Sequence, residues 1–214
     1  MAESFTGLAP NRIAANLARV RERIAAVGED PGRVEICAAT KYVPAAELPA
    51  LAEGGVELVG ENRAQELLAK RARHADLFAW DFIGALQSRK VRDVAPAVRL
   101  IHSVASDSAL AQLAKHPAGA VLIQVNVAGE EGKAGIAPDE LGDFIARCPV
   151  PVAGLMTMPP LTERAEDSRP HFARLAELAA EHGLKRLSMG TTQDFEVAVE
   201  EGATIVRLGT VLYR

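Results

Sequence analysis

The feature that most constrains the fold is a regular alternation of short β-rich runs with helical patterns along the 214 residues. No two runs are joined by a two-residue turn, so hairpins are not indicated, and helical crossovers predict parallel pairing. Several runs are apolar at successive positions, as strands covered on both faces are. The eight runs cover residues 34–40, 56–59, 79–84, 98–104, 120–127, 152–158, 186–189 and 204–208.

A helix is predicted before the first run. Apolar residues recur there at alternating spacings of four and three, at Ile13, Leu17, Val20, Ile24 and Val27, which places them on one helix face. Seven further helical patterns follow the runs, at residues 45–53, 61–76, 88–95, 107–115, 138–147, 164–182 and 193–201.

This element order predicts an α/β protein that is a single (β/α)8 TIM barrel domain over residues 1–214, with an extra N-terminal helix. The chain is shorter than the usual barrel of about 250 residues, so its loops must be short. The alternative is a doubly wound open sheet. Six strands would suit that fold better, and the expected Gly-x-Gly-x-x-Gly after the first strand is absent.

Composition narrows the class of protein. The formal charge of −4 argues against a nucleic-acid or anionic-membrane partner. Residues 148–162 form the longest uncharged stretch, but its 15 residues include four prolines and are too few to span a bilayer, which takes about 20. Glu3 stands where a signal peptide needs a base, and Cys37 and Cys148 suit a reducing compartment. We therefore expect a cytoplasmic protein.

The ends of the last two predicted strands have the features of a phosphate site. Barrels often bind phosphate on the loops after strands seven and eight. Gly190 and Gly209 would let backbone N–H groups approach an anion, and the hydroxyls of Ser188, Thr192 and Thr210 could add donors. We expect a ligand phosphate here.

A helix start is also expected in this region. Thr191 or Thr192 would begin the helix and Asp194 would complete a capping box. Free N–H groups and the helix dipole would then favour an anion. The alternative is a turn and a helix cap that bind no ligand.

Lys41 and Arg207 suggest which chemical groups the ligand carries besides its phosphate. Lys41 follows the first strand and could face the mouth of the barrel, where partial burial would lower the pKa of its ammonium group and free a nucleophilic amine. A lysine opposite a phosphate site indicates pyridoxal 5′-phosphate held as a Schiff base. A Schiff-base aldolase would use the same two parts, and an exposed lysine before Pro44 is the alternative. Arg207 alternates with apolar residues and should meet a ligand atom or a buried acid.

Seven stretches together resemble one family, the pyridoxal-phosphate homeostasis proteins (the YggS/PROSC-like group), which is related to the N-terminal barrel of alanine racemase. Gly-Glu-Asn-Arg, Gly-x-Leu-Gln-x-x-Lys and Ser-Met-Gly are jointly specific for it. The stretches are AATKYVP at 38–44, GENRAQE at 60–66, FIGALQSRK at 82–90, IHSV at 101–104, GLMTMPP at 154–160, LSMG at 187–190 and VRLGT at 206–210.

The resemblance implies a barrel that binds pyridoxal 5′-phosphate, with Lys41 as the lysine of the internal aldimine and Arg207 at the pyridine nitrogen. It implies that Asn62 and Met156 lie near the ring. The residues that it implies around the phosphate are Ser188, Gly190, Thr192, Gly209 and Thr210.

The chain departs from the family pattern at several positions. Asp81 stands where the family usually has His, and Ala85 replaces the usual Pro. Thr191 replaces a Met, and Ala105 replaces the usual Asp after His-Ser-Val. These changes affect fine contacts rather than the lysine or the phosphate site.

The resemblance implies a non-catalytic carrier that binds and delivers the cofactor, with PLP-dependent apoenzymes as its protein partners. The alternative is an amino-acid racemase or decarboxylase of the alanine-racemase barrel type. Racemases of that type add a β-domain and use a tyrosine from the partner subunit, whereas the tyrosines here are Tyr42 and Tyr213 and the sequence stops at the eighth strand. One lysine serves one face of a substrate, so two-base racemisation is not expected. We expect a monomer, because no helix face is plainly apolar on its outer side.

Overall fold

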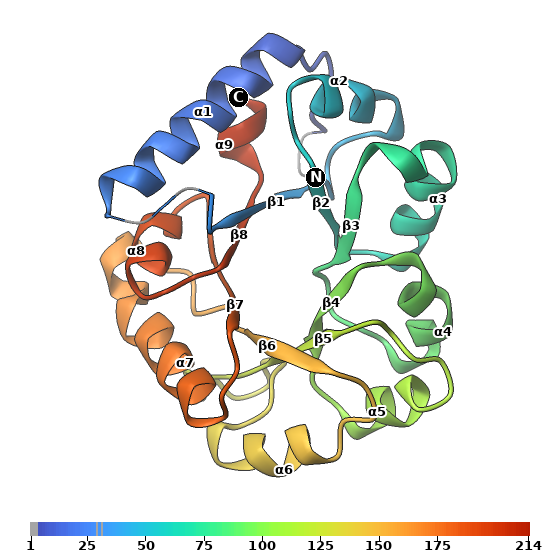
Figure 1. The fold of residues 1–214 in the computed structure, drawn as a ribbon, viewed down its shortest axis with the longest axis vertical. Coiled ribbons are helices and arrows are strands. Elements are labelled where there is room, and N and C mark those ends of the chain that lie inside the picture. Colours follow the sequence, from blue (N-terminus) through green and yellow to red (C-terminus); the bar gives the residue numbers. More distant parts are fainter. Residues whose placement is uncertain (1–3, 29, 31) are drawn as a thin grey trace.

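Eight parallel strands form a closed barrel, in which β8 pairs with β1 (Figure 1). The structure is a computed structural model that describes residues 4–28, 30 and 32–214. The (β/α)8 barrel that the sequence predicts is confirmed, and each of the eight predicted runs overlaps a strand. The strands are β1 Glu35–Ala39, β2 Leu58–Glu61, β3 Ala79–Phe82, β4 Leu100–Val104, β5 Val121–Gln124, β6 Val152–Met156, β7 Arg186–Thr191 and β8 Ile205–Leu208.

Helices surround the barrel, and the predicted N-terminal helix is present. It buries Ile13, Leu17, Val20 and Ile24 and lies beside the last helix of the chain (Figure 1). The α-helices are α1 Pro10–Ala26, α2 Leu48–Glu53, α3 Ala64–His74, α4 Val91–Val94, α5 Asp107–Leu113, α6 Leu141–Ala146, α7 Arg169–Glu181, α8 Phe195–Glu200 and α9 Thr210–Tyr213. The short 3-10 turns are η1 Ala45–Glu47, η2 Ala75–Leu77, η3 Ser88–Lys90, η4 Ala95–Ala97, η5 Pro138–Glu140 and η6 Ala165–Ser168.

The predicted start of the helix after strand seven is wrong. Helix α8 begins at Phe195, and Asp194 is its N-cap residue. The Asp194 carboxylate accepts hydrogen bonds from the Thr191 backbone N–H (2.7 Å) and hydroxyl (3.1 Å), and the bond to the N–H is the one that the predicted capping box requires of Asp194. The helix nevertheless starts later than predicted, so Thr191 ends β7 and Thr192 lies in the turn ahead of α8.

Two apolar clusters hold the barrel together. The larger cluster fills the space between the strands and the helices. Alternate strand residues point inward, and one layer of the interior is apolar. The members of this inner cluster are Cys37, Leu58, Leu100, Leu122, Met156 and Ile205. Buried polar side chains lie in the same barrel, among them Asp81, His102, Ser188 and Arg207.

Gly190 is required by helix packing. Its φ is +86°, and a Cβ there would lie 2.6 Å from the Ala198 Cβ and 3.0 Å from the Phe195 Cα. We expect Gly190→Ala to lower the free energy of unfolding by about 1–3 kcal/mol, because strain and overpacking add. Urea unfolding measures it, with Gly183→Ala as control, since Gly183 has a φ of +64° and open space around it. Equal losses in the two variants would show that the contact with α8 is not the cause.

Candidate functional site

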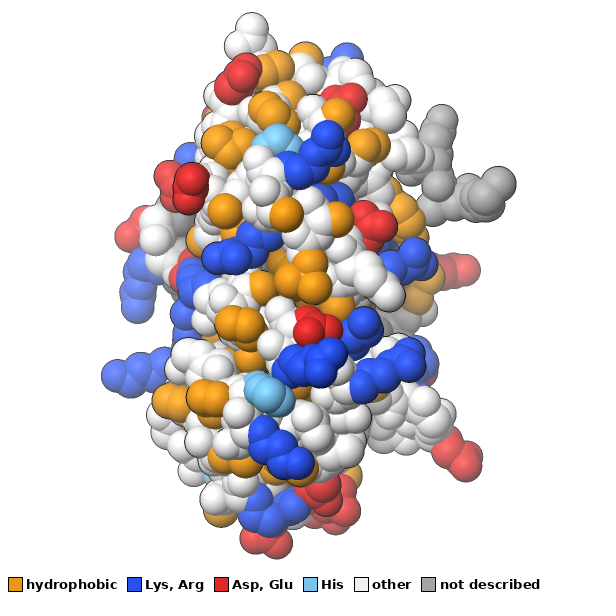
Figure 2. Space-filling view, turned by 90° about the vertical axis from the view of Figure 1, so that its right-hand side faces the viewer, with side chains coloured by type: hydrophobic (Ala, Val, Ile, Leu, Met, Phe, Trp, Pro, Cys, Tyr) orange, Lys and Arg blue, Asp and Glu red, His pale blue; other side chains and the backbone are white. Residues whose placement is uncertain are grey.

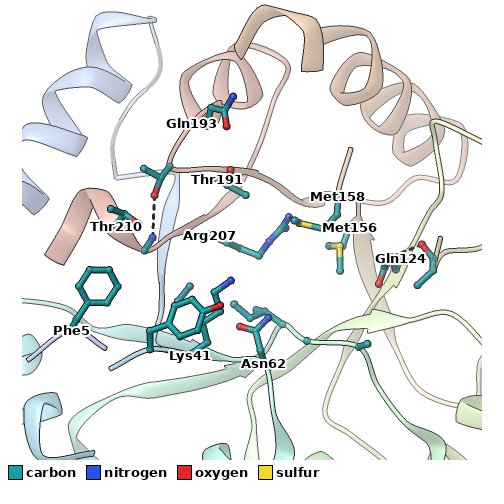
Figure 3. A pocket seen from close by; sticks show the side chains of 18 of the residues that line it. Phe5, Lys41, Asn62, Gln124, Met156, Met158, Thr191, Gln193, Arg207 and Thr210 are labelled. Carbon is teal, nitrogen blue, oxygen red and sulfur yellow. Dashed lines mark hydrogen bonds between the residues drawn. The ribbon is translucent and has the colours of Figure 1, made fainter. Parts of the chain in front are cut away.

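A cavity of about 800 Å³ opens at the carboxyl ends of the strands (Figure 3). Seven of the nine residues predicted for the site line it. Figure 3 shows Lys41 and Asn62 on one wall, Thr191 and Thr210 on the other, and Arg207 between them. The seven predicted residues on the cavity wall are Lys41, Asn62, Met156, Thr192, Arg207, Gly209 and Thr210.

Lys41 emerges from a firmly held strand end. The backbone carbonyl of Thr40 accepts a hydrogen bond of 2.8 Å from the Lys70 Nζ, and Lys70 forms a buried ion pair of 2.5 Å with Glu61. The Thr40 hydroxyl donates to the same Glu61 oxygen at 2.6 Å. Buried charges that are paired and hydrogen-bonded keep their geometry, so the residue before Lys41 is fixed.

The Lys41 side chain itself is exposed, so the partial burial expected from the sequence is not found. Its Nζ lies 4.8 Å from the centre of the Tyr42 ring, which is within the range of a cation–π contact. The amine lines the cavity at a rigid attachment point and is open to an incoming aldehyde.

Arg207 is 6% exposed and lies at the centre of the cavity. Its Nη1 donates to the Ser188 hydroxyl (2.5 Å), and its Nη2 donates to the Thr157 carbonyl (2.9 Å) and contacts the Met158 sulfur (2.8 Å). Burial lowers the pKa of Arg207 to about 10, which leaves it charged at neutral pH. Within residues 4–28, 30 and 32–214 no acid forms an ion pair with it, so the alternative of an ion pair with a buried acid is not observed.

Asn62 contributes an unsatisfied polar group. Its Oδ1 is buried without a hydrogen-bond partner in the described part of the chain, and Asn62 also lines the cavity. An unpaired buried acceptor is costly, so this amide is suited to a polar ligand atom. The Asn62 backbone N–H donates to Glu61 (3.3 Å), which ties the residue to the ion pair behind Lys41.

The loops after β7 and β8 meet at the other wall. The Gly209 N–H donates to the Thr192 hydroxyl at 3.3 Å, a bond drawn dashed in Figure 3. A Cβ at Gly209 would meet only the Ala39 carbonyl, at 3.8 Å, so the glycine leaves open space above the backbone. The N–H groups of Thr192 and Thr210 have no backbone acceptor among the residues that the structure describes. This wall therefore presents several donors to an anion.

Ser188 and Gly190 are not brought to the cavity wall. The Ser188 side chain is fully buried and hydrogen-bonds to His102 Nδ1 (2.9 Å) as well as to Arg207. Gly190 packs against α8. The structure therefore does not place either residue on the cavity wall, where the sequence predicts them beside a phosphate.

Several cavity residues were not predicted from the sequence. Phe5 reaches the cavity because its N–H donates to the Tyr42 carbonyl (2.9 Å), a pairing between distant segments that leaves no local pattern. Met158 was placed at a strand exit but given no role. The cavity residues that were not predicted to contact the ligand include Phe5, Tyr42, Gln124, Met158, Thr191, Gln193 and Arg214.

The described residues hold no group of three or more His, Cys, Asp or Glu side chains that could bind a metal ion. Among the same residues, no helix has the length and apolar character needed to cross a membrane.

Comparison with known proteins identifies the family. The model of the alanine racemase N-terminal domain matches residues 9–214. The pyridoxal phosphate homeostasis protein of Aquifex aeolicus is 44% identical over 92% of this chain and 95% of its own length. The chain belongs to the pyridoxal phosphate homeostasis protein family. The family member of Pseudomonas aeruginosa is 40% identical, with 94% of this chain and 93% of that protein covered.

Solved structures agree with this assignment. PipY of Synechococcus elongatus PCC7942, solved with PLP bound, is 33% identical with a TM-score of 0.79, and the match covers 94% of this chain and all of PipY. Alanine racemase from Corynebacterium glutamicum shares the fold, with a TM-score of 0.72 at 16% identity, over 96% of this chain and 61% of the racemase. The family resemblance seen in the sequence is thus confirmed.

Proposed function

We propose that this chain binds pyridoxal 5′-phosphate in the cavity, with Lys41 as the Schiff-base lysine, and acts in cofactor homeostasis by binding and delivering it. One observation carries the proposal: the Lys41 amine and the donors of the β7 and β8 loops line the same cavity of about 800 Å³. The names of the Aquifex and Pseudomonas relatives and the PLP in PipY support the same ligand.

The residues present fit this cofactor. The open space at Gly209 lets a phosphate approach the backbone, and Thr192 and Thr210 add hydroxyl donors. Asn62 supplies the unsatisfied amide, and Met156 would offer the ring an apolar surface. When bound, the cofactor supplies an aldehyde that condenses with amines and a ring that can withdraw electrons.

Arg207 supports a role without catalysis. A guanidinium only donates hydrogen bonds and does not give up its proton, so a ring nitrogen facing it stays unprotonated. The ring is then a poor electron sink, which disfavours the racemase or decarboxylase alternative. The Cα proton of a bound amino acid should stay in place.

Proton exchange tests this role. We expect the loaded protein to leave the α-proton of alanine unexchanged in D2O, measured by NMR against a blank of free cofactor. Arg207→Glu should raise the exchange rate above wild type, because a carboxylate lets the ring nitrogen hold a proton. Rapid exchange by the wild-type protein would contradict the non-catalytic proposal.

The distribution of hydrophobic side chains on the surface is relevant to how the protein would contact its proposed partners. On the side of the barrel where α3 and α4 lie, Figure 2 shows hydrophobic side chains scattered among Lys and Arg rather than joined in one patch. The absence of one broad apolar patch on this face supports the proposed monomer, which would meet PLP-dependent apoenzymes only transiently. The cytoplasm remains the place where we expect it to act.

Titration and transfer test the function as a whole. Added pyridoxal 5′-phosphate should give a visible absorption band that saturates at one equivalent. The loaded protein, freed of unbound cofactor, should then restore activity to a PLP-dependent apoenzyme. A protein that gives no band under saturating cofactor would contradict the proposal.

A further inference from the structure

A chain of hydrogen bonds crosses the barrel interior directly beneath the cavity. Arg207 Nη1 lies 2.5 Å from the Ser188 Oγ, and that oxygen lies 2.9 Å from His102 Nδ1. His102 Nε2 lies 3.0 Å from the Asp81 Oδ2. All four residues are buried, and the Asp81 and His102 side chains are fully enclosed.

The far end of this chain is anchored. Arg99 donates to both oxygens of Asp81, at 3.1 and 2.7 Å, and also to Glu35 at 2.7 Å. Burial on its own would raise the pKa of Asp81, but the hydrogen bonds from His102 and Arg99 outweigh it and lower that pKa. Asp81 is therefore a carboxylate that accepts at both oxygens.

The two end groups fix every proton between them. Arginine only donates and a carboxylate only accepts, so Ser188 must accept from Arg207 and donate to His102 Nδ1. His102 then carries its proton on Nε2 and donates it to Asp81. If the His102 ring carried a second proton, the Ser188 hydroxyl would have no acceptor among these four side chains. Burial lowers the pKa of His102, which agrees with a neutral ring.

We propose that Ser188, His102 and Asp81 are positioning residues for Arg207, which orient its guanidinium so that a free N–H faces the ring nitrogen of the bound cofactor. The proposal rests on the proposed function. Ser188 holds Nη1 and the Thr157 carbonyl holds Nη2. Among the described residues the Arg207 Nε and the second N–H of Nη1 have no acceptor, so the guanidinium keeps free N–H groups for a ligand in the cavity.

The arrangement accounts for the Asp81 departure from the family pattern and gives Ser188 a role other than the one expected from the sequence. Asp81, where the family usually has His, ends the chain of hydrogen bonds as its acceptor. Ser188 affects the ligand through Arg207 and not as a phosphate donor. Its hydroxyl is fully buried, accepts from Arg207 and donates to His102. A long arginine side chain loses much rotamer freedom on being held, so fixing it in advance favours ligand binding.

A double-mutant cycle tests this role by measuring the dissociation constant of pyridoxal 5′-phosphate. Ser188→Ala should weaken binding about tenfold, because one charge-assisted hydrogen bond to Arg207 is lost. In an Arg207→Met background, Ser188→Ala should have no further effect. His102→Phe removes the next link and should show the same pattern, which keeps the test decisive if Ser188→Ala does not fold. Ile205→Val, beside Ser188 in the barrel interior, is the control and should keep wild-type affinity.

Two outcomes would overturn the proposal. Wild-type affinity in folded Ser188→Ala would show that the chain does not position Arg207. Equal weakening by Ser188→Ala with and without Arg207 would show that Ser188 acts directly on the ligand or on the fold. Failure of the proposed function is distinct, because the wild-type protein would then bind no cofactor.

Discussion

Replacing Lys41 by alanine is expected to abolish the visible absorption band of the loaded protein while leaving the fold intact. Lys41 is exposed at the barrel mouth and contributes little core packing, so urea unfolding should match wild type. The phosphate wall remains, so binding should persist but weaken by about a hundredfold or more, because the anchored aldehyde no longer has an amine beside it. Absorbance and equilibrium dialysis measure the two effects.

Lys185→Ala is the matched control for this substitution. Lys185 is also exposed, and it lies before β7, at the opposite end of the barrel from the cavity. The control should keep both the band and the affinity. A Lys41→Ala protein that retains the visible band would show that another lysine holds the cofactor.

The second large effect is expected at Gly209. Gly209→Val places a branched side chain in the space where the phosphate must approach the backbone. A Cβ there meets only the Ala39 carbonyl, at 3.8 Å, so the first added carbon has room. We expect binding to weaken by about tenfold to a hundredfold, as for the loss of one or two hydrogen bonds to a charged group.

Gly119→Val separates this effect from a general cost of losing a glycine. Gly119 lies before β5, away from the cavity, and nothing is within 4 Å of a Cβ built there. Its valine variant should bind the cofactor as wild type does. If a folded Gly209→Val protein binds the cofactor with wild-type affinity, the phosphate does not bind at this wall.

The fold was predictable because its signal is repeated eight times along the chain. Parallel strands buried on both faces leave short apolar runs, and each crossover leaves a helical pattern. The short helix α9 was missed because four residues at the C-terminus carry too little periodicity. The start of α8 was misplaced because the Asp194 bond back to Thr191 closes a turn ahead of the helix, and the sequence does not show that this turn is not yet helical.

Site residues at the ends of strands could be predicted from the sequence. Side chains whose direction is set by neighbours across the barrel could not. Lys41 follows from its place after the first strand and Arg207 from its place in the last, whereas Asn62 was implied by the family resemblance. All three line the cavity. Ser188 was assigned from its residue type, but its direction depends on His102, which lies 86 residues away in the sequence. No single-sequence pattern reports such a contact.

Borohydride reduction of the loaded native protein, followed by peptide mapping, tests the central claim most directly. Reduction fixes a Schiff base as a stable secondary amine, so the modified lysine can be located by mass. The account predicts one adduct per chain, on Lys41. An adduct on Lys133 or another lysine, with Lys41 unmodified, would contradict it.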